Sequence, residues 1–235
     1  MIDAPALRAR LDEVRGRIAR AALRVGRDPA GVRLIAVSKT FGAEHVRAAA
    51  EAGQRDFGEN KVQEALDKMD RTGDLDLAWH LIGHLQSNKA RKAGARFSVV
   101  HSVDDADLVR RLNEAAGAAG RTLQILVQAD LAGEATKHGA PEAALDGIFA
   151  AAAAAGHLDP IGLMLIPPSV DDPERARPYF RALRAVRDQL LARGVPPGRL
   201  RELSMGMSHD FEVAVEEGAT MVRVGTAIFG SRGRP

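Results

Sequence analysis

The sequence predicts an α/β fold, namely a single (β/α)8 barrel of the TIM type with an extra N-terminal helix over residues 1–27. Eight short apolar runs alternate with helical patterns along the 235 residues. Strands that each feed a helix form parallel sheets, and eight such units in a chain of this length are typical of a closed barrel. Because no Pro-, Gly- or Ser-rich linker divides the chain, we expect one domain over residues 1–235. A doubly wound open sheet is the alternative.

The first element is an amphipathic helix from residue 4 to about residue 25. Its apolar residues recur at helical spacing and form one face that packs on the barrel: Leu7, Leu11, Val14 and Ile18. The arginines of this helix are interrupted by Asp12 and Glu13. This mixture of charges indicates a solvated outer surface rather than a nucleic-acid-binding one.

The eight expected strands and the helices between them follow in alternation. The strands lie near residues 33–39, 55–58, 78–83, 98–102, 123–129, 160–166, 201–205 and 221–225. The helices begin near Ala43, Asn60, Ser87, Asp104, Pro141, Asp172 and Ser208. The alanine run 150–155 belongs to the helix that begins at Pro141, because alanine is the strongest helix former.

Composition and charge exclude several classes of protein. Aromatic residues make up only 4% and the net charge is +2, which disfavours stacking on single-stranded nucleic acid. The absence of cysteine excludes disulfides, thiol catalysis and cysteine-ligated metals. No apolar stretch reaches the length of a membrane span, and residues 1–5 lead into a charged helix rather than a signal peptide. We therefore expect a cytoplasmic monomer that contacts neither nucleic acid nor membranes.

One lysine, Lys39, ends the first apolar run, residues 34–40. In α/β folds the carboxyl ends of parallel strands carry the chemistry, and a lysine amine there can add to a carbonyl group and form a Schiff base. A strand-end lysine in isolation would more often point into water, because lysine is almost never fully buried. The far end of the chain favours the chemical interpretation.

Two C-terminal segments have the composition of an anion-binding site. Residues 203–210 and 221–230 each form a short strand that ends in small residues and a hydroxyl. Small residues let backbone N–H groups approach an anion, and Ser208 stands at an expected helix start, which favours phosphate. A plain helix cap at Ser208 and a tight turn at Gly225 are the structural alternatives. In a closed barrel strand eight neighbours strand one, so Lys39 should lie beside these segments.

Six segments of the chain carry a family resemblance: AVSKT (36–40), FGENKVQE (57–64), WHLIGHLQSNK (79–89), GLM (162–164), SMGMS (204–208) and RVGTAIFG (223–230). Together they resemble the pyridoxal phosphate homeostasis protein family, and the match spans nearly the whole chain. That family in turn resembles the barrel domain of alanine racemase. The resemblance implies a barrel that binds pyridoxal 5′-phosphate (PLP) as its cofactor.

The resemblance also implies roles for individual residues. Lys39 is implied to bind PLP as a Schiff base. Ser208, Gly225 and Thr226 are implied to hold the phosphate, and Arg223 to face the pyridine nitrogen.

Asn60 and Met164 are implied by the same resemblance to lie around the ring. The resemblance assigns no catalytic residue to this chain.

Arg223 has a chemical consequence that does not depend on the family. Arginine is always charged and only donates hydrogen bonds, so it would leave the pyridine nitrogen unprotonated and weaken the electron sink of a PLP enzyme. Racemisation also needs a second base on the opposite face of the cofactor. In alanine racemase that base is a tyrosine from a second domain. The only tyrosine here, Tyr179, lies in a helical stretch and is expected on the barrel exterior.

Two further groups of residues invite a chemical role. His80 and His84 flank Gly83, but as a metal pair they lack a clustered third ligand. We expect them to form structural hydrogen bonds or to lie near the cofactor, and we expect no metal. Lys137, after the fifth strand, is expected to be a solvated loop lysine; the alternative is that it takes a second aldehyde or a phosphate.

The sequence therefore favours a non-catalytic PLP-binding protein of intracellular PLP homeostasis. Such a protein buffers PLP or supplies it, by transient contact, to PLP-dependent apoenzymes. The alternative is a PLP-dependent amino-acid racemase. The missing second domain and its tyrosine favour the first function.

Overall fold

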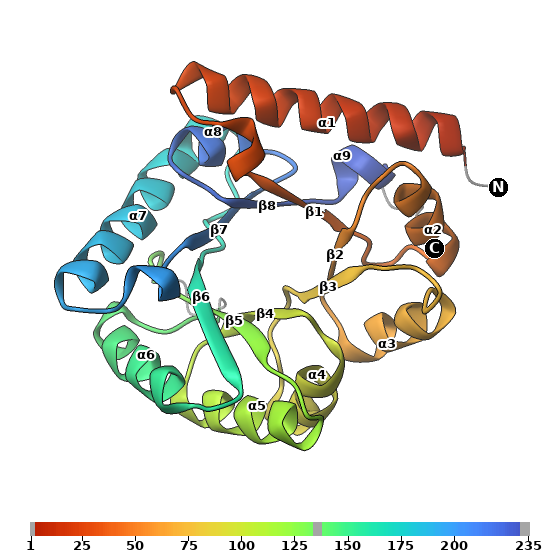
Figure 1. Cartoon of the computed structure of the whole chain (residues 1–235). Coiled ribbons are helices and arrows are strands. Elements are labelled where there is room, and N and C mark those ends of the chain that lie inside the picture. The colour runs from red at the N-terminus through yellow and green to blue at the C-terminus, as the bar shows by residue number, and fades with distance from the viewer. Residues whose placement is uncertain (1–2, 134–137, 231–235) are drawn as a thin grey trace.

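The computed structural model describes residues 3–133 and 138–230 of the chain, so Lys137 lies outside the described residues. Eight parallel strands close into a barrel in the order β1 to β8, and β8 pairs with β1 (Figure 1). The expected (β/α)8 fold is confirmed, and the open sheet is wrong. Each strand is followed by a helix that covers the outside of the sheet.

The strands are β1 (Arg33–Val37), β2 (Asp56–Glu59), β3 (Ala78–Leu81), β4 (Val99–Val103), β5 (Leu123–Gln128), β6 (Leu158–Met164), β7 (Glu202–Met207) and β8 (Met221–Val224). The helices are α1 (Ala4–Arg24), α2 (Ala43–Glu51), α3 (Val62–Arg71), α4 (Ala90–Arg96), α5 (Ala106–Ala118), α6 (Leu145–Ala154), α7 (Arg177–Ala192), α8 (Phe211–Glu216) and α9 (Thr226–Phe229). Short 3-10 segments occupy Pro29–Gly31, Ser87–Lys89, Glu142–Ala144, Pro173–Ala176 and Pro197–Arg199.

The segment after β7 differs from the sequence-based expectation. Helix α8 begins at Phe211 with Asp210 as its N-cap, so Ser208 does not stand at a helix start. The reason is a tight turn: the Asp210 carboxylate accepts a hydrogen bond from the Met207 N–H at 2.6 Å, and the Asp210 N–H donates to the Met207 carbonyl. Ser208 therefore lies in the turn between β7 and α8.

Two apolar layers hold the barrel together. A small cluster fills the interior: Ile35, Val99, Leu126, Ile161, Met164 and Met221. A larger layer lies between the strands and the surrounding helices and includes the fully buried Phe57, Phe97 and Phe180. Full burial of each such side chain contributes about 1.5–3 kcal/mol relative to exposure. These layers fix the positions of the strand ends, on which the site depends.

Helix α1 lies across the outside of the barrel beside α8 and α9 (Figure 1). Its four predicted apolar residues are at most 4% exposed, which confirms the predicted amphipathic face. The Arg10 side chain also donates to the Ile228 carbonyl of α9 at 2.5 Å. Across the described ranges, neither α1 nor any other helix combines the length and apolar character needed to cross a membrane.

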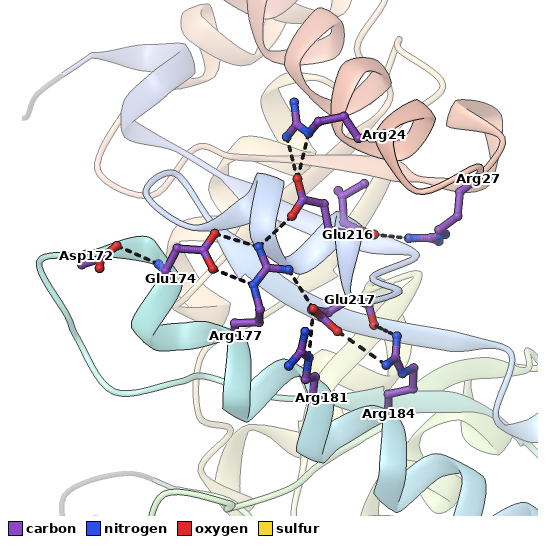
Figure 2. Close-up of polar contacts among 10 residues, drawn as sticks. Arg24, Arg27, Asp172, Glu174, Arg177, Arg181, Arg184, Glu216 and Glu217 are labelled. Atoms are coloured by element: carbon purple, nitrogen blue, oxygen red, sulfur yellow. Dashed lines mark hydrogen bonds and ion pairs between the residues drawn. The ribbon is translucent and has the colours of Figure 1, made fainter.

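Ion pairs bind α8 to both of its neighbouring helices (Figure 2). Arg177 of α7 contacts Glu216 and Glu217 at 2.7 Å each, and Arg24 of α1 contacts Glu216 at 2.8 Å. Burial pushes the Glu217 pKa upward, but hydrogen bonds from Arg177 and Arg181 outweigh it and leave that pKa lowered. This network fastens the C-terminal end of α8 to α1 and α7.

Candidate functional site

A cavity of about 280 Å³ opens at the carboxyl ends of the strands. Six of the seven residues expected to bind the cofactor line it: Lys39, Asn60, Ser208, Arg223, Gly225 and Thr226. Lys39 and Asn60 follow β1 and β2, whereas Ser208 and Gly225 follow β7 and β8. Barrel closure therefore brings the two ends of the chain to one site.

The pairing of β1 with β8 explains why Lys39 and Gly225 share this cavity. Ala36 of β1 pairs with Val224 of β8, so the residues that follow them leave the sheet side by side. A Cβ atom at Gly225 would lie 3.1 Å from the Val37 carbonyl oxygen. Glycine at this position thus permits the close approach of the two strand ends.

A hydroxyl and a backbone N–H meet at the β7 and β8 side of the cavity. The Gly225 N–H donates a hydrogen bond to Ser208 Oγ at 3.1 Å. Because a hydroxyl that accepts a bond keeps its own hydrogen for donation, Ser208 still offers a donor. Thr226, the first residue of α9, supplies a second hydroxyl to the cavity lining.

The backbone directly after Lys39 is held in an unusual conformation. The next residue, Thr40, has a positive φ of 71°, which a β-branched residue adopts only under constraint. The Thr40 N–H donates to Glu64 Oε1 of α3 at 2.6 Å. This bond ties the turn that follows Lys39 to α3, and Lys39 itself lines the cavity.

A buried ion pair between Lys68 and Glu59 contacts the same turn. Lys68 Nζ donates to the Ser38 carbonyl at 2.8 Å and to Glu59 Oε1 at 2.6 Å. The Ser38 hydroxyl also donates to Glu59 Oε1, at 2.6 Å. Burial raises the Glu59 pKa, although the bonds from Lys68 and Ser38 act in the opposite direction. The residue preceding Lys39 is therefore held through both its backbone and its side chain.

Arg223 is fixed at the inner wall of the cavity and is only 4% exposed. Its guanidinium donates to Ser204 Oγ at 2.7 Å and to the Leu165 carbonyl at 2.9 Å. Burial lowers the Arg223 pKa to about 10, while Asp210 acts in the opposite direction. The side chain therefore remains a charged donor at neutral pH.

A chain of hydrogen bonds runs from Arg223 through the interior of the barrel. Ser204 Oγ lies 2.9 Å from His101 Nδ1, and His101 Nε2 lies 2.9 Å from His80 Nδ1. His80 Nε2 lies 3.0 Å from Asp56 Oδ1, at the start of β2. The chain thus joins the cavity to the amino-terminal end of the barrel.

The groups at the two ends of this chain determine which atom donates in each of its hydrogen bonds. Burial lowers the pKa of His80, and burial together with the nearby His80 and Arg223 lowers that of His101 well below its usual value. Both rings are therefore neutral. Arginine only donates and a carboxylate only accepts, so Ser204 donates to His101, His101 to His80 and His80 to Asp56.

Met164 is the one predicted residue that does not line the cavity. It is fully buried in the apolar cluster inside the barrel, because its strand β6 ends there and its side chain faces the interior. Ile166, two residues later, forms that part of the lining instead. His209, to which the sequence assigned no role, also lines the cavity and contacts the Asp171 carbonyl at 2.8 Å.

The two histidines that flank Gly83 are separated by the fold. His80 is fully buried in the interior chain, as its predicted structural hydrogen bonding requires. His84 is exposed, and its ring stacks on that of His138 with centroids 3.6 Å apart. They do not form a pair.

Sequence reasoning missed several buried polar residues that position the site, namely Glu59, Lys68, His101 and Ser204. A signal for three of them was present, since Glu59, His101 and Ser204 are polar residues inside apolar strands. Such residues are buried only when they are hydrogen-bonded. Their partners come from other strands or helices, and so cannot be read from local spacing.

Comparison with known proteins places this site in a family. The model of the alanine racemase N-terminal domain matches residues 2–233. The chain is 41% identical to the pyridoxal phosphate homeostasis protein of Aquifex aeolicus over 223 residues, which cover 95% of this chain and 97% of that one. It is 42% identical to the protein of the same name from Escherichia coli K12 over 228 residues, covering 94% and 95% of the two chains.

Solved structures show the same barrel. PipY of Synechococcus elongatus, solved with PLP bound, is 43% identical with a TM-score of 0.80, and the match covers 91% of this chain and all of that one. Alanine racemase of Clostridium difficile is 15% identical with a TM-score of 0.74, covering 98% of this chain and 58% of that one, which shows the fold alone. The chain belongs to the alanine racemase N-terminal domain family and, within it, to the pyridoxal phosphate homeostasis proteins.

Proposed function

We propose that this protein binds PLP in the barrel cavity and serves intracellular PLP homeostasis without a catalytic cycle of its own. The observation that carries the proposal is the convergence of Lys39 with Ser208, Gly225 and Thr226 in one cavity. The PLP-bound structure of PipY, at 43% identity, supports the same ligand.

The residues of the cavity fit this cofactor. Its volume, about 280 Å³, is close to the lower limit of small-molecule pockets, which span about 300–1,000 Å³. Lys39 and Arg223 supply positive charge for an anionic ligand. Glycine at position 225 lets this strand end pack closely against the Val37 carbonyl, and Ser208 Oγ, which accepts from the Gly225 N–H, keeps its own hydrogen to donate to a phosphate.

Each side chain has a distinct task in this proposal. When bound, PLP supplies an aldehyde that a lysine amine can capture. Lys39 would provide that amine, and Arg223 would donate a hydrogen bond to the pyridine nitrogen. The Ser208 and Thr226 hydroxyls would donate to the phosphate, and the Gly225 N–H, which donates to Ser208 Oγ at 3.1 Å, orients the first of them. Asn60 lies in the cavity lining, where it would contact the ring.

Two features disfavour turnover. A charged arginine at the pyridine nitrogen leaves that atom without the proton that an acidic partner would retain there. Racemisation further requires a second placed base, and Tyr179, the only tyrosine of the chain, lies on α7 outside the barrel. We therefore assign this chain a binding function, with the racemase as the alternative that an assay must exclude.

The proposal extends to the context of the protein. We propose that residues 1–235 act as one PLP-binding domain, as a monomer in the cytoplasm. Release of PLP to PLP-dependent apoenzymes would occur through the open mouth of the cavity, with transient contacts only. Such a protein keeps the reactive free aldehyde at a low concentration.

One preparation tests the proposed function. The purified chain is loaded with PLP, dialysed and analysed for bound cofactor, with Lys39→Ala as the non-binding control. The loaded protein is then mixed with a PLP-dependent apoenzyme whose recovered activity reports transfer. In parallel, racemisation, transamination and decarboxylation of amino acids are assayed.

We expect about one PLP per chain, transfer to the apoenzyme and negligible turnover. Retention of PLP equal in wild type and Lys39→Ala would overturn the assigned site. Robust turnover of an amino acid would overturn the non-catalytic function and support the racemase.

A further inference from the structure

We propose that this protein binds a divalent transition-metal ion, Zn²⁺, through His84, Asp104 and His138 on the rim of the barrel. One ligand atom of each residue lies within 4.8 Å of the others. None of the three lines the cavity assigned to PLP. The inference therefore concerns a second site and does not rest on the proposed function.

The three residues come from the ends of three consecutive strands. His84 follows β3, Asp104 is the first residue after β4, and His138 follows β5. Neighbouring parallel strands present their carboxyl ends side by side on one face of a barrel. The fold thus gives His84 two partner ligands, Asp104 and His138, in place of His80.

Hydrogen bonds hold the backbone of both histidine segments. The Ser102 hydroxyl of β4 donates to the Gly83 carbonyl at 2.7 Å, directly before His84. The Gln128 side chain of β5 donates to the His138 carbonyl at 2.5 Å. These bonds fix the backbone next to each histidine and leave the imidazole rings themselves available for an ion.

The three side chains lie near one another, but not in the arrangement that they would take around an ion. The His84 and His138 rings are stacked, with centroids 3.6 Å apart and an interplanar angle of 11°, and His84 Nδ1 lies 3.8 Å from Asp104 Oδ2. Ligand atoms at about 2.0–2.1 Å from a tetrahedral Zn²⁺ lie roughly 3.4 Å apart. Because an imidazole nitrogen binds a metal in the plane of its ring, the two stacked rings must splay apart, and ligand atoms that now lie within 4.8 Å of one another must close to that spacing.

The ligand atoms of the two histidines and the aspartate favour Zn²⁺ over Mg²⁺ and Ca²⁺. Two imidazole nitrogens and one carboxylate oxygen are ligands of Zn²⁺, and water can complete a tetrahedral site. Mg²⁺ and Ca²⁺ prefer sets of oxygen ligands instead. The Asp104 side chain is only 15% exposed. A bound cation would compensate the charge of this half-buried carboxylate.

The site adjoins a segment of the PLP cavity. A Cβ atom at Gly83 would lie 2.4 Å from the Asn60 carbonyl oxygen, so the segment before His84 packs directly against the segment after β2. Asn60 itself lines the cavity. An ion that joins the ends of β3, β4 and β5 would therefore brace the wall next to the cavity.

Metal titration of the full chain tests the proposal. The protein is stripped of metal with a chelator and titrated with Zn²⁺ by calorimetry, and with Co²⁺ as a spectroscopic probe. The variants are His84→Ala, His138→Ala and Asp104→Asn, which change one ligand each. His157→Ala is the matched control, because His157 is exposed and directly precedes β6 at the opposite end of the barrel. Lys39→Ala separates metal binding from PLP binding.

We expect one Zn²⁺ per chain and a visible Co²⁺ absorption typical of tetrahedral N and O ligands. Each ligand variant should weaken Zn²⁺ binding at least about tenfold, since even an outer partner of a ligand costs 10–100-fold. His157→Ala and Lys39→Ala should bind as wild type, and Zn²⁺ should raise the Tm of wild type but not of the ligand variants. Unchanged affinity in His84→Ala and His138→Ala, or loss of binding in Lys39→Ala alone, would overturn the proposal.

Discussion

The guanidinium of Arg223 donates a 2.7 Å hydrogen bond to the Ser204 hydroxyl in the closed interior of the barrel. This bond is the first link of the chain that continues through His101 and His80 to Asp56. Every donor in the chain points from Arg223 toward Asp56, so each bond polarises the next. The chain holds the buried positive charge of Arg223 at the inner wall of the cavity.

Replacement of Ser204 by alanine tests this chain. Ser204→Ala leaves both the Arg223 N–H and His101 Nδ1 without their partner in a dry interior, so we expect a loss of about 1–3 kcal/mol in the free energy of unfolding. Urea denaturation of the PLP-free protein measures it. Ser87→Ala, at an exposed position, should change this free energy by less than about 0.5 kcal/mol. Equal stability of both variants would contradict the role of the chain.

Replacement of Lys68 tests the buried ion pair with Glu59 that holds the residue before Lys39. Lys68→Met leaves the Glu59 carboxylate buried without its cation, and Glu59 Oε2 already has no hydrogen-bond partner among the described residues. We expect a loss of about 3–5 kcal/mol at pH 7. The exposed Lys92→Met is the control, since Lys92 contacts only Gln63 in the described hydrogen bonds.

The pH dependence of that loss identifies its cause. Burial already raises the Glu59 pKa above its usual 4.5, and loss of Lys68 should raise it further. When the pKa of a carboxyl is higher in the folded than in the unfolded protein, that carboxyl adds to the free energy of unfolding at any pH below its unfolded-state pKa. This contribution is lost as the pH rises through the folded-state pKa. The deficit of Lys68→Met should therefore be full at pH 7 and shrink as the pH falls toward 4.5. If Lys68→Met lowers the free energy of unfolding by the same amount at every pH, the loss comes from side-chain packing and not from the charge of Glu59.

The attachment of PLP is tested by chemical trapping. Borohydride reduction of the loaded protein should fix the cofactor to the peptide that contains Lys39, because the reduced carbon–nitrogen bond is stable. Mass spectrometry of the digest locates the label, and Lys39→Ala should abolish both the label and the absorbance band of the lysine-bound cofactor. Label found chiefly on Lys61 or Lys137 would reject the assignment.

The phosphate contacts are tested by two conservative changes. Ser208→Ala and Thr226→Val each remove one hydrogen bond to a charged group, worth about 1.5–3 kcal/mol, so each should weaken PLP binding roughly 10–150-fold. Equilibrium dialysis measures the affinity. Pyridoxal, which lacks the phosphate, serves as the matched ligand and should bind both variants as it binds wild type. Equal losses for the two ligands would count against a phosphate site here.

The arginine at the pyridine nitrogen is tested by an acidic replacement. Arg223→Glu offers an acid that can keep this nitrogen protonated, so slow adventitious amino-acid turnover should exceed that of wild type. Arg223→Gln removes the charge without offering an acid and should not gain activity. Circular dichroism checks that both variants fold. Wild-type turnover near 1 s⁻¹, the range of ordinary enzymes, would contradict the proposed effect of Arg223.

The architecture could be predicted because its signals are local. Strands of the barrel are apolar on both faces, so each appears as a short apolar run bounded by a helical pattern. The expected strand at residues 33–39 appears as β1 (Arg33–Val37), and that at 123–129 as β5 (Leu123–Gln128). The error at Ser208 had a local cause too, since the Asp210 carboxylate closes a turn that delays α8.

Part of the site could be predicted for a related reason. Lys39 and Gly225 each end a strand, and the closure of an eight-stranded barrel brings strand one beside strand eight. Met164 could not be placed in the same way. Its strand position was clear, but which residues of β6 face the interior and which reach the cavity depends on where the strand leaves the sheet.

The sequence by itself determined the alternation of strands and helices, and the residues at the strand ends that carry the proposed chemistry. Only the tertiary structure decided which polar side chains meet inside and across the barrel. His101 and Ser204 are 103 residues apart, and His84 meets His138 only because β3, β4 and β5 end side by side. Local patterns fix a backbone through short-range sterics and burial. Long-range partners are fixed by barrel closure, which no single segment of the chain encodes.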